Sequence, residues 1–86
     1  LGGAWFVALT KVTSIWEEAV GPQVAQHAKP LGVRGKALTV AVDNQGWATQ
    51  LQFLGSEILG KIANLAPGIE LDELLVKVQP RAFKNP

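Results

Sequence analysis

The residue types that most often carry acid–base or nucleophilic chemistry are scarce in this chain and are not spaced to work together. His27 is the single histidine, and neither an acid nor a cysteine lies near it in the sequence. A general base needs an orienting partner and a substrate proton within reach. We therefore expect His27, at the end of a short predicted helix, to interact with the last carbonyl groups of that helix. Glu17 and Glu18 are adjacent, so they point about 100° apart on a helix and do not form a facing acid pair.

Serine and metal chemistry are equally unsupported. Ser14 and Ser56 fall within predicted helices, without the sharp turn that exposes a serine nucleophile. The chain contains no cysteine, so it forms neither a disulfide nor a thiolate metal site, and it has no glycine-rich P-loop to hold a phosphate. The sequence thus predicts a protein that is not an enzyme, uses no cofactor or metal, and resides in the cytoplasm, where cysteine stays reduced.

Basic residues offer the clearest binding chemistry. The formal net charge is only +1, which is low for a domain whose whole function is to grip a phosphate backbone. Six basic residues nevertheless form two groups along the chain. The groups are Lys29, Arg34 and Lys36, and Lys77, Arg81 and Lys84. If the groups meet in the fold, we expect one positive edge that binds single-stranded DNA weakly and loses affinity steeply with salt; the alternative is that each side chain is simply solvated.

The aromatic residues divide into two kinds. Trp16 and Trp47 lie on apolar stripes with helical spacing, which predicts core packing; the alternative is contact with a partner, where tryptophan is enriched. Trp5 and Phe6 are adjacent, so one helix cannot bury both equally well. We expect one of them to be exposed and available to a partner or to a neighbouring copy.

These residues must be positioned by alternating helices and strands. Apolar residues recur at helical spacing in the long helical segments and alternate with period two in the extended ones. The predicted helices are residues 4–20, 22–27 and 47–65, and the predicted extended segments are residues 31–33, 37–42 and 74–79. Residues 34–36 form the predicted turn of a hairpin, and Asp43 or Asn44 is expected to cap the second long helix.

This order is typical of an α+β fold with two layers, in which helices cover one face of a three-stranded sheet. Along residues 37–42 the large side chains point one way, and Ala37, Thr39 and Ala41 point the other, so the second sheet face is expected to be low in bulk and open. The predicted core consists of Trp16, Leu38, Val40, Val42, Trp47, Leu51, Leu54, Ile58 and Ile62.

The chain is expected to form a single domain over residues 1–86, with a flexible basic tail over residues 81–86. No apolar run is long enough to span a bilayer, and residues 1–9 lack the basic start of a signal peptide. The chain begins with Leu rather than Met, which favours a fragment or a processed product of a longer protein with flanking segments.

An ordered set of residues resembles a known family. The set is Trp16, Gly21, Ala25, His27, Pro30, the strand at residues 38–42, Trp47, Ala48 and Leu51, continuing through Ile58 and Leu59. This pattern is similar to that of the DUF721 family, whose characterised members are the DciA loaders of the bacterial replicative helicase. The resemblance weakens past Pro67.

The resemblance implies a KH-like domain and a non-enzymatic adaptor that binds the replicative helicase, helps to place it on single-stranded DNA, and binds DNA weakly itself. Such loaders lack an ATPase domain, and this chain has no Walker A motif. Two alternatives stay open: a general KH-like module that binds single-stranded nucleic acid, and a scaffold that binds only protein. Gln50, where many relatives have Glu, and a last strand with few arginines are departures from the family pattern that weigh against DNA contact at that strand.

The stretch Gly32–Gly35 has the spacing GxxG, which clamps the nucleic-acid backbone in KH domains. In those domains the motif joins two helices, whereas here it lies between two predicted strands. We therefore favour a hairpin turn, in which glycine supplies a positive φ angle at low cost.

Overall fold

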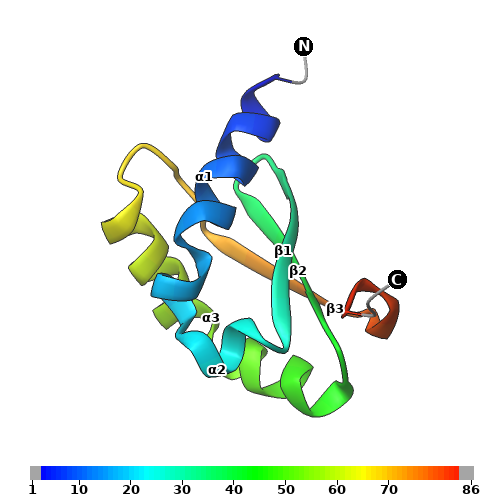
Figure 1. Cartoon of the computed structure of the whole chain (residues 1–86). Helices are drawn as coiled ribbons and strands as arrows, with labels where there is room; N and C mark the ends of the chain where they lie inside the picture. The colour runs from blue at the N-terminus through cyan, green and yellow to red at the C-terminus, as the bar shows by residue number, and fades with distance from the viewer. Residues whose placement is uncertain (1–2, 84–86) are drawn as a thin grey trace.

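The structure, a computed structural model, describes residues 3–83 of the chain, with side chains from Trp5 onward. Its elements follow the predicted order of helix, short helix, two strands, helix and strand (Figure 1). They are α1 (Gly3–Val20), α2 (Pro22–Ala25), β1 (Ala28–Arg34), β2 (Ala37–Val42), α3 (Gln45–Leu65), β3 (Glu73–Val78) and the 3-10 helix η1 (Pro80–Phe83). The predicted α+β fold with helices packed on a three-stranded sheet is confirmed.

The first long helix is anchored to the sheet by one tryptophan. α1 presents Val12, Trp16 and Ala19 to the core, where all three are buried. The indole Nε1 of Trp16 donates a hydrogen bond of 2.9 Å to the backbone oxygen of Ala28, the first residue of β1. α1 ends before Gly21, whose φ angle of 91° is one that glycine adopts at low cost.

The short second helix ends two residues earlier than predicted. Its last residue is Ala25 rather than His27, because the backbone N–H of His27 donates to the oxygen of Val24 at 2.9 Å and closes a tight turn. The chain then enters β1 directly. His27 therefore lies between helix and strand and does not cap a helical end.

The first strand is longer than the predicted segment over residues 31–33, and it includes Pro30. Proline has no backbone N–H, so it is tolerated only where a strand has a free edge or a bulge. β1 offers both, since it is an edge strand and its pairing with β2 shifts by one residue between Pro30 and Gly32. This β-bulge leaves Leu31 as the extra residue of β1.

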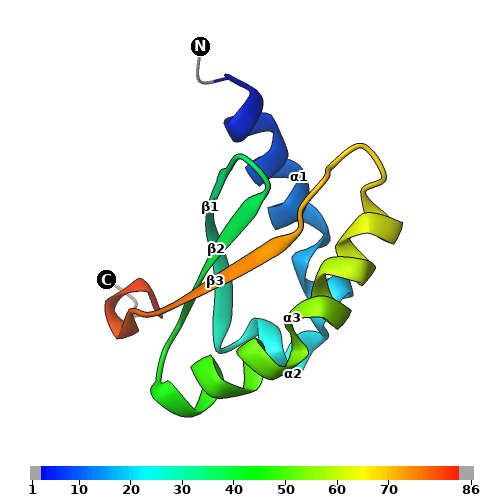
Figure 2. The ribbon, with the colours of Figure 1, turned by 180° about the vertical axis from the view of Figure 1, so that it is seen from behind.

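The sheet has the order β1-β2-β3, with β2 antiparallel to β1 and parallel to β3. The hairpin between β1 and β2 turns at Gly35, whose φ angle is 60°, as expected for a turn rather than a clamp between helices. α3 makes the crossover between the parallel strands. Figures 1 and 2 show α1 and α3 on the same side of the sheet and η1 away from them.

The second long helix begins and ends at the predicted signals. The Asn44 side chain caps α3, because its Oδ1 accepts a hydrogen bond of 3.0 Å from the backbone N–H of Trp47. This is the interaction that an N-cap residue provides to an otherwise unpaired donor. α3 closes at Leu65, with Ala66 as its C-cap before Pro67. No helix among residues 3–83 is long and apolar enough to cross a membrane.

Most of the predicted core is buried. The buried members are Trp16, Leu38, Val40, Val42, Leu51, Ile58 and Ile62. Trp47 and Leu54 are only partly buried and pack against the rest of the core. Trp47 stays near the surface because it occupies the first turn of α3, beside the end of the hairpin.

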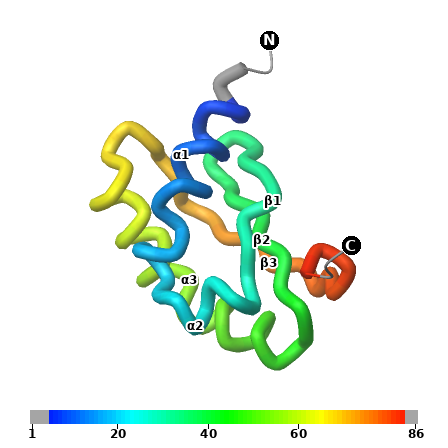
Figure 3. Tube along the Cα trace, viewed as in Figure 1, coloured from blue at the N-terminus to red at the C-terminus, as the bar shows by residue number. Residues whose placement is uncertain are grey.

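The described part of the C-terminal segment, where a basic tail was expected, forms a short 3-10 helix. Pro80–Phe83 form η1, which folds back towards the hairpin, as the trace in Figure 3 shows. The backbone N–H of Gln79 donates to the oxygen of Val42 at 2.8 Å, and the ammonium of Lys29 donates to the backbone oxygen of Ala82. The bond to Ala82 thus connects η1 to the sheet, whereas residues 84–86 lie outside the described part of the chain.

Candidate binding surfaces

One face of the sheet carries neither of the long helices α1 and α3, and of the described elements only η1 packs on it, at one end. Its composition follows from the strand register. We define it as the open face. Its residues are Lys29, Gly32, Arg34, Ala37, Thr39, Ala41, Glu73, Leu75 and Lys77, which pair in rows across the three strands. The central strand contributes only small side chains, so the longer side chains of the two edge strands rise on either side of a shallow floor.

One row of the open face gathers basic residues. Lys29 of β1 and Lys77 of β3 are both in register with Ala41 of β2, which places their Cα atoms two strand spacings apart, or roughly 10 Å. Ala41 is fully buried, so the floor between the two lysines is covered. Arg81 follows on η1 at the same end of the sheet.

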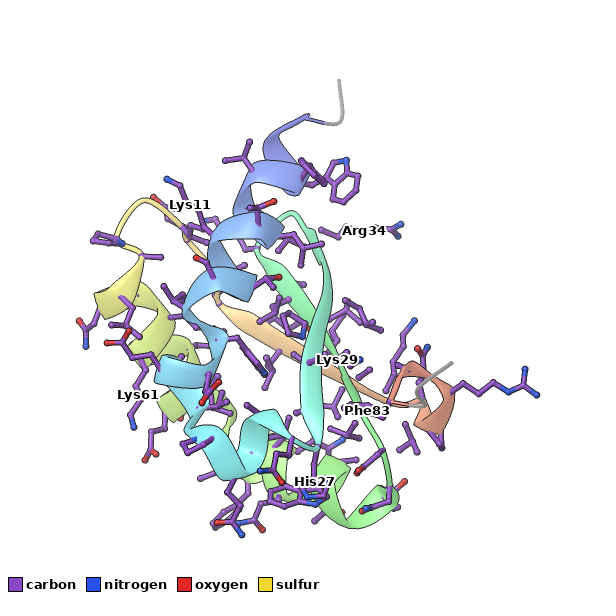
Figure 4. All side chains as sticks on the ribbon, viewed as in Figure 1. Lys11, His27, Lys29, Arg34, Lys61 and Phe83 are labelled. Atoms are coloured by element: carbon purple, nitrogen blue, oxygen red, sulfur yellow. The ribbon has the colours of Figure 1, made fainter. Side chains whose placement is uncertain are left out.

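Lys29 is also tied to the C-terminal turn. Its Nζ atom lies 4.8 Å from the centre of the Phe83 ring, a cation–π geometry, in addition to the hydrogen bond to Ala82. In Figure 4, Lys29 and Phe83 lie close to each other near η1, and Arg34 lies farther along the sheet, towards the hairpin turn. The basic group at this end therefore has a partly fixed geometry.

The other predicted basic residues do not join this group. Arg34 and Lys36 lie at the hairpin end of the sheet, and the Nζ atom of Lys36 is 3.8 Å from the Oε1 atom of Glu70. The backbone oxygen of Lys36 accepts hydrogen bonds from the N–H groups of Asp72 and Glu73, which brings two further acids to this end. The structure thus places Lys29 and Lys77 in one row of the open face, with Arg81 beyond it on η1. Acidic residues lie beside Lys36, and Lys84 lies outside the described residues.

A second surface is apolar and lies at the start of α1. Trp5, Phe6 and Val7 are 48%, 60% and 54% exposed, and we define them as the N-terminal patch. The Trp5 and Phe6 rings meet edge to face with centres 5.8 Å apart. Both predicted partner-binding residues are therefore exposed, rather than one of them.

A groove of about 390 Å³ begins at this patch. It runs between α1, the hairpin turn and the loop before β3, and one basic and one acidic side chain are among its lining residues. The lining residues are Val7, Ala8, Lys11, Val33, Gly35, Gly68, Ile69, Glu70 and Leu71. The N-terminal patch and this groove form one continuous, mainly apolar surface.

Two features of the surface escaped the sequence analysis. Phe53 on α3 is 88% exposed; its position off the apolar stripe of that helix was the sequence signal that could have predicted this exposure.

His27 was expected to bind helical carbonyls, but its Nδ1 atom lies 2.7 Å from the Oδ2 atom of Asp43. Its ring stacks on that of Trp47, with ring centres 4.8 Å apart and an angle of 12° between the planes. Asp43 is remote in sequence and becomes a neighbour only through the hairpin.

No cluster of three or more histidine or acidic side chains that could hold a metal ion occurs within residues 3–83. The pair formed by His27 and Asp43 has no serine or other nucleophile against it in the described hydrogen bonds.

Comparison with known proteins shows the family to which this chain belongs. The family described as Dna[CI] antecedent, DciA, matches residues 3–76, from the start of α1 into β3. The chain belongs to the DciA family. The predicted DUF721 resemblance is confirmed, and it extends beyond the segment that suggested it.

Relatives of this DciA-family chain are bacterial proteins named only UPF0232. The chain is 46% identical to one from Rhodococcus jostii over 48 residues, which is 56% of this chain and 26% of the relative. It is 42% identical to one from Mycolicibacterium paratuberculosis over 57 residues, or 66% and 32%. With one from Mycobacterium ulcerans it shares 39% over 62 residues, or 72% and 33%. The chain thus matches about a third or less of the length of these relatives.

Proposed function

We propose that this chain is a non-enzymatic adaptor domain that binds the bacterial replicative helicase and assists its loading onto single-stranded DNA. The observation that carries the proposal is the match over residues 3–76 to the family described as Dna[CI] antecedent, DciA. The surfaces support it, because an exposed apolar patch and a separate basic row suit two different partners.

The N-terminal patch suits the helicase. Exposed tryptophan and phenylalanine side chains contribute strongly to protein interfaces when a partner covers them. Trp5 and Phe6 project beside a groove that holds Lys11 and Glu70 at its rim, so a partner can bury the rings and still pair both charges.

The open face suits weak DNA binding. Lys77 and Arg81 supply phosphate contacts at the edge of the open face, beside the end where η1 engages Lys29 and Ala41 is buried. None of the described strand residues of the open face is aromatic, and the nearby Phe83 ring on η1 is engaged by Lys29, so the strands offer bases no ring to stack on. Affinity then depends mainly on the release of counterions and falls steeply with salt.

The action of such an adaptor comes from binding free energy alone. A loader without nucleotide hydrolysis shifts the helicase towards a DNA-accepting state by binding that state more tightly than the closed one. The shift cannot exceed the difference between the two binding free energies.

The test combines two measurements on the full-length protein. Capture of the replicative helicase by the immobilised protein is expected, together with oligonucleotide binding that weakens as salt rises. Oligonucleotide binding without helicase capture favours the general nucleic-acid module. Capture of a protein other than the helicase, with no oligonucleotide binding, favours the protein scaffold. Absence of helicase capture defeats the proposal.

A further inference from the structure

The two edges of the sheet differ in how they are protected against pairing. The free edge of β1 contains Pro30, which has no N–H, and a bulge at Leu31, and both devices block the addition of another strand. β3 has neither a proline nor a bulge over Glu73–Val78. Among the described residues, no backbone hydrogen bond reaches the outer edge of β3.

The direction of the free backbone groups on β3 follows from its hydrogen bonds to the hairpin. The N–H of Glu73 donates to Lys36, and that of Gln79 donates to Val42, so odd-numbered residues of this strand point towards β2. Because backbone groups alternate along a strand, the N–H and C=O groups of Leu74, Val76 and Val78 point outwards. They are the groups that a fourth strand would meet.

The side chains of β3 make this edge complementary to itself. Consider an antiparallel pair of two β3 strands with its two-fold axis at Leu75. The outward-pointing backbone groups of Leu74 then lie opposite those of Val76 of the second copy, which is the arrangement of a hydrogen-bonded pair. The same register sets Glu73 opposite Lys77 of the second copy, twice by symmetry. Neither Glu73 nor Lys77 has an ion-pair partner among the described residues, and Leu75 is 42% exposed.

We propose that two copies of this chain associate through antiparallel pairing of their β3 strands, with the two-fold axis at Leu75. The product is one continuous sheet formed from two three-stranded sheets, in which the two open faces lie side by side. Cross-strand pairs of opposite charge and of apolar side chains stabilise such a junction. The right-handed twist between neighbouring strands, about 20–25°, splays the two helical layers that cover the other face.

The proposal is independent of the proposed function, and reversal of the two charges tests it. Sedimentation velocity over a concentration series is expected to show a monomer–dimer equilibrium for the unaltered chain. Glu73→Lys and Lys77→Glu each place like charges opposite one another, so each is expected to weaken the dimer by about tenfold or more. The double variant Glu73→Lys/Lys77→Glu restores both pairs and should restore dimerisation.

Mixing the two single variants gives the sharpest arm. A Glu73→Lys chain and a Lys77→Glu chain are complementary to each other, so a mixture should form heterodimers that neither forms alone. Lys61→Glu on α3 is the matched control and is expected to leave the dimer unchanged. A chain that stays monomeric at high concentration, single variants that dimerise as well as the unaltered chain, or a mixture that stays monomeric would each overturn the proposal.

Discussion

His27 and Asp43 face each other across the open end of the hairpin, with 2.7 Å between Nδ1 and Oδ2. The pair continues the β1–β2 register by one step beyond Ala28 and Val42, and the backbone N–H of Asp43 donates to the oxygen of His27 at 3.2 Å. A carboxylate only accepts hydrogen bonds, so the Nδ1 atom carries the proton. One face of the imidazole stacks on Trp47, and the three side chains together connect the segment after α2, the hairpin and α3.

This junction predicts a measurable coupling between His27 and Asp43. His27→Ala removes both the hydrogen bond and the ring stacking, and it should lower the free energy of unfolding by about 1–2 kcal/mol. Asp43→Ala should cost about 1 kcal/mol. In urea unfolding, the double variant is expected to lose less than the sum of the two single variants, because the shared contact is lost only once. Additive losses would show that the two side chains act separately.

The two core tryptophans are expected to differ in their effect on stability. Trp16 is 5% exposed and donates a hydrogen bond to the Ala28 oxygen. Trp16→Ala should therefore lower the free energy of unfolding by about 3–5 kcal/mol. Trp16→Phe leaves the Ala28 oxygen unpaired and should lower it by about 1–3 kcal/mol. Trp47 is only partly buried, so Trp47→Ala should cost roughly half as much as Trp16→Ala. Thermal and urea unfolding of the three variants measure the order, and equal losses for Trp16→Ala and Trp47→Ala would contradict it.

The salt dependence of DNA binding should identify the basic residues that contact phosphate. Lys77→Ala and Arg81→Ala are each expected to weaken oligonucleotide binding and to reduce the slope of log affinity against log salt by about one. Lys36→Ala is the matched control, because Lys36 lies beside Glu70 at the acidic end of the sheet. If Lys36→Ala weakens binding as much as Lys77→Ala, the DNA site is not the basic row of the open face.

The N-terminal patch should affect partner binding without affecting folding. Phe6→Ser and Trp5→Ser remove apolar surface that is already in contact with solvent, so the melting temperature should stay within a few degrees. Helicase affinity is expected to fall by about tenfold or more for at least one of them, as for an interface hot spot. Phe53→Ser is the control, since Phe53 is the most exposed large apolar side chain among the described residues and lies on α3. A loss of affinity with Phe53→Ser alone would move the helicase contact to α3.

The sequence by itself determined the elements and their order. The period of the apolar residues separates the two long helices from strand 37–42, and Asn44 and Pro67 mark where the second helix starts and stops. These signals are local, because they depend on the helical and strand repeats and on the capping chemistry of neighbouring residues. The family resemblance has the same origin, since it consists of such signals in a particular order.

The tertiary structure decided which side chains meet. Pairing at the hairpin turn sets Arg34 opposite Ala37, and an unbroken ladder from there would set His27 opposite Asn44 and turn Lys29 towards the core. The bulge at Leu31 shifts the register by one residue, which moves His27 opposite Asp43 and places Lys29 on the open face. A one-residue shift reverses every side chain beyond it because the strand repeat is two. Residues that lie far apart in sequence are paired by that register, and the spacing of residues along the chain does not contain it.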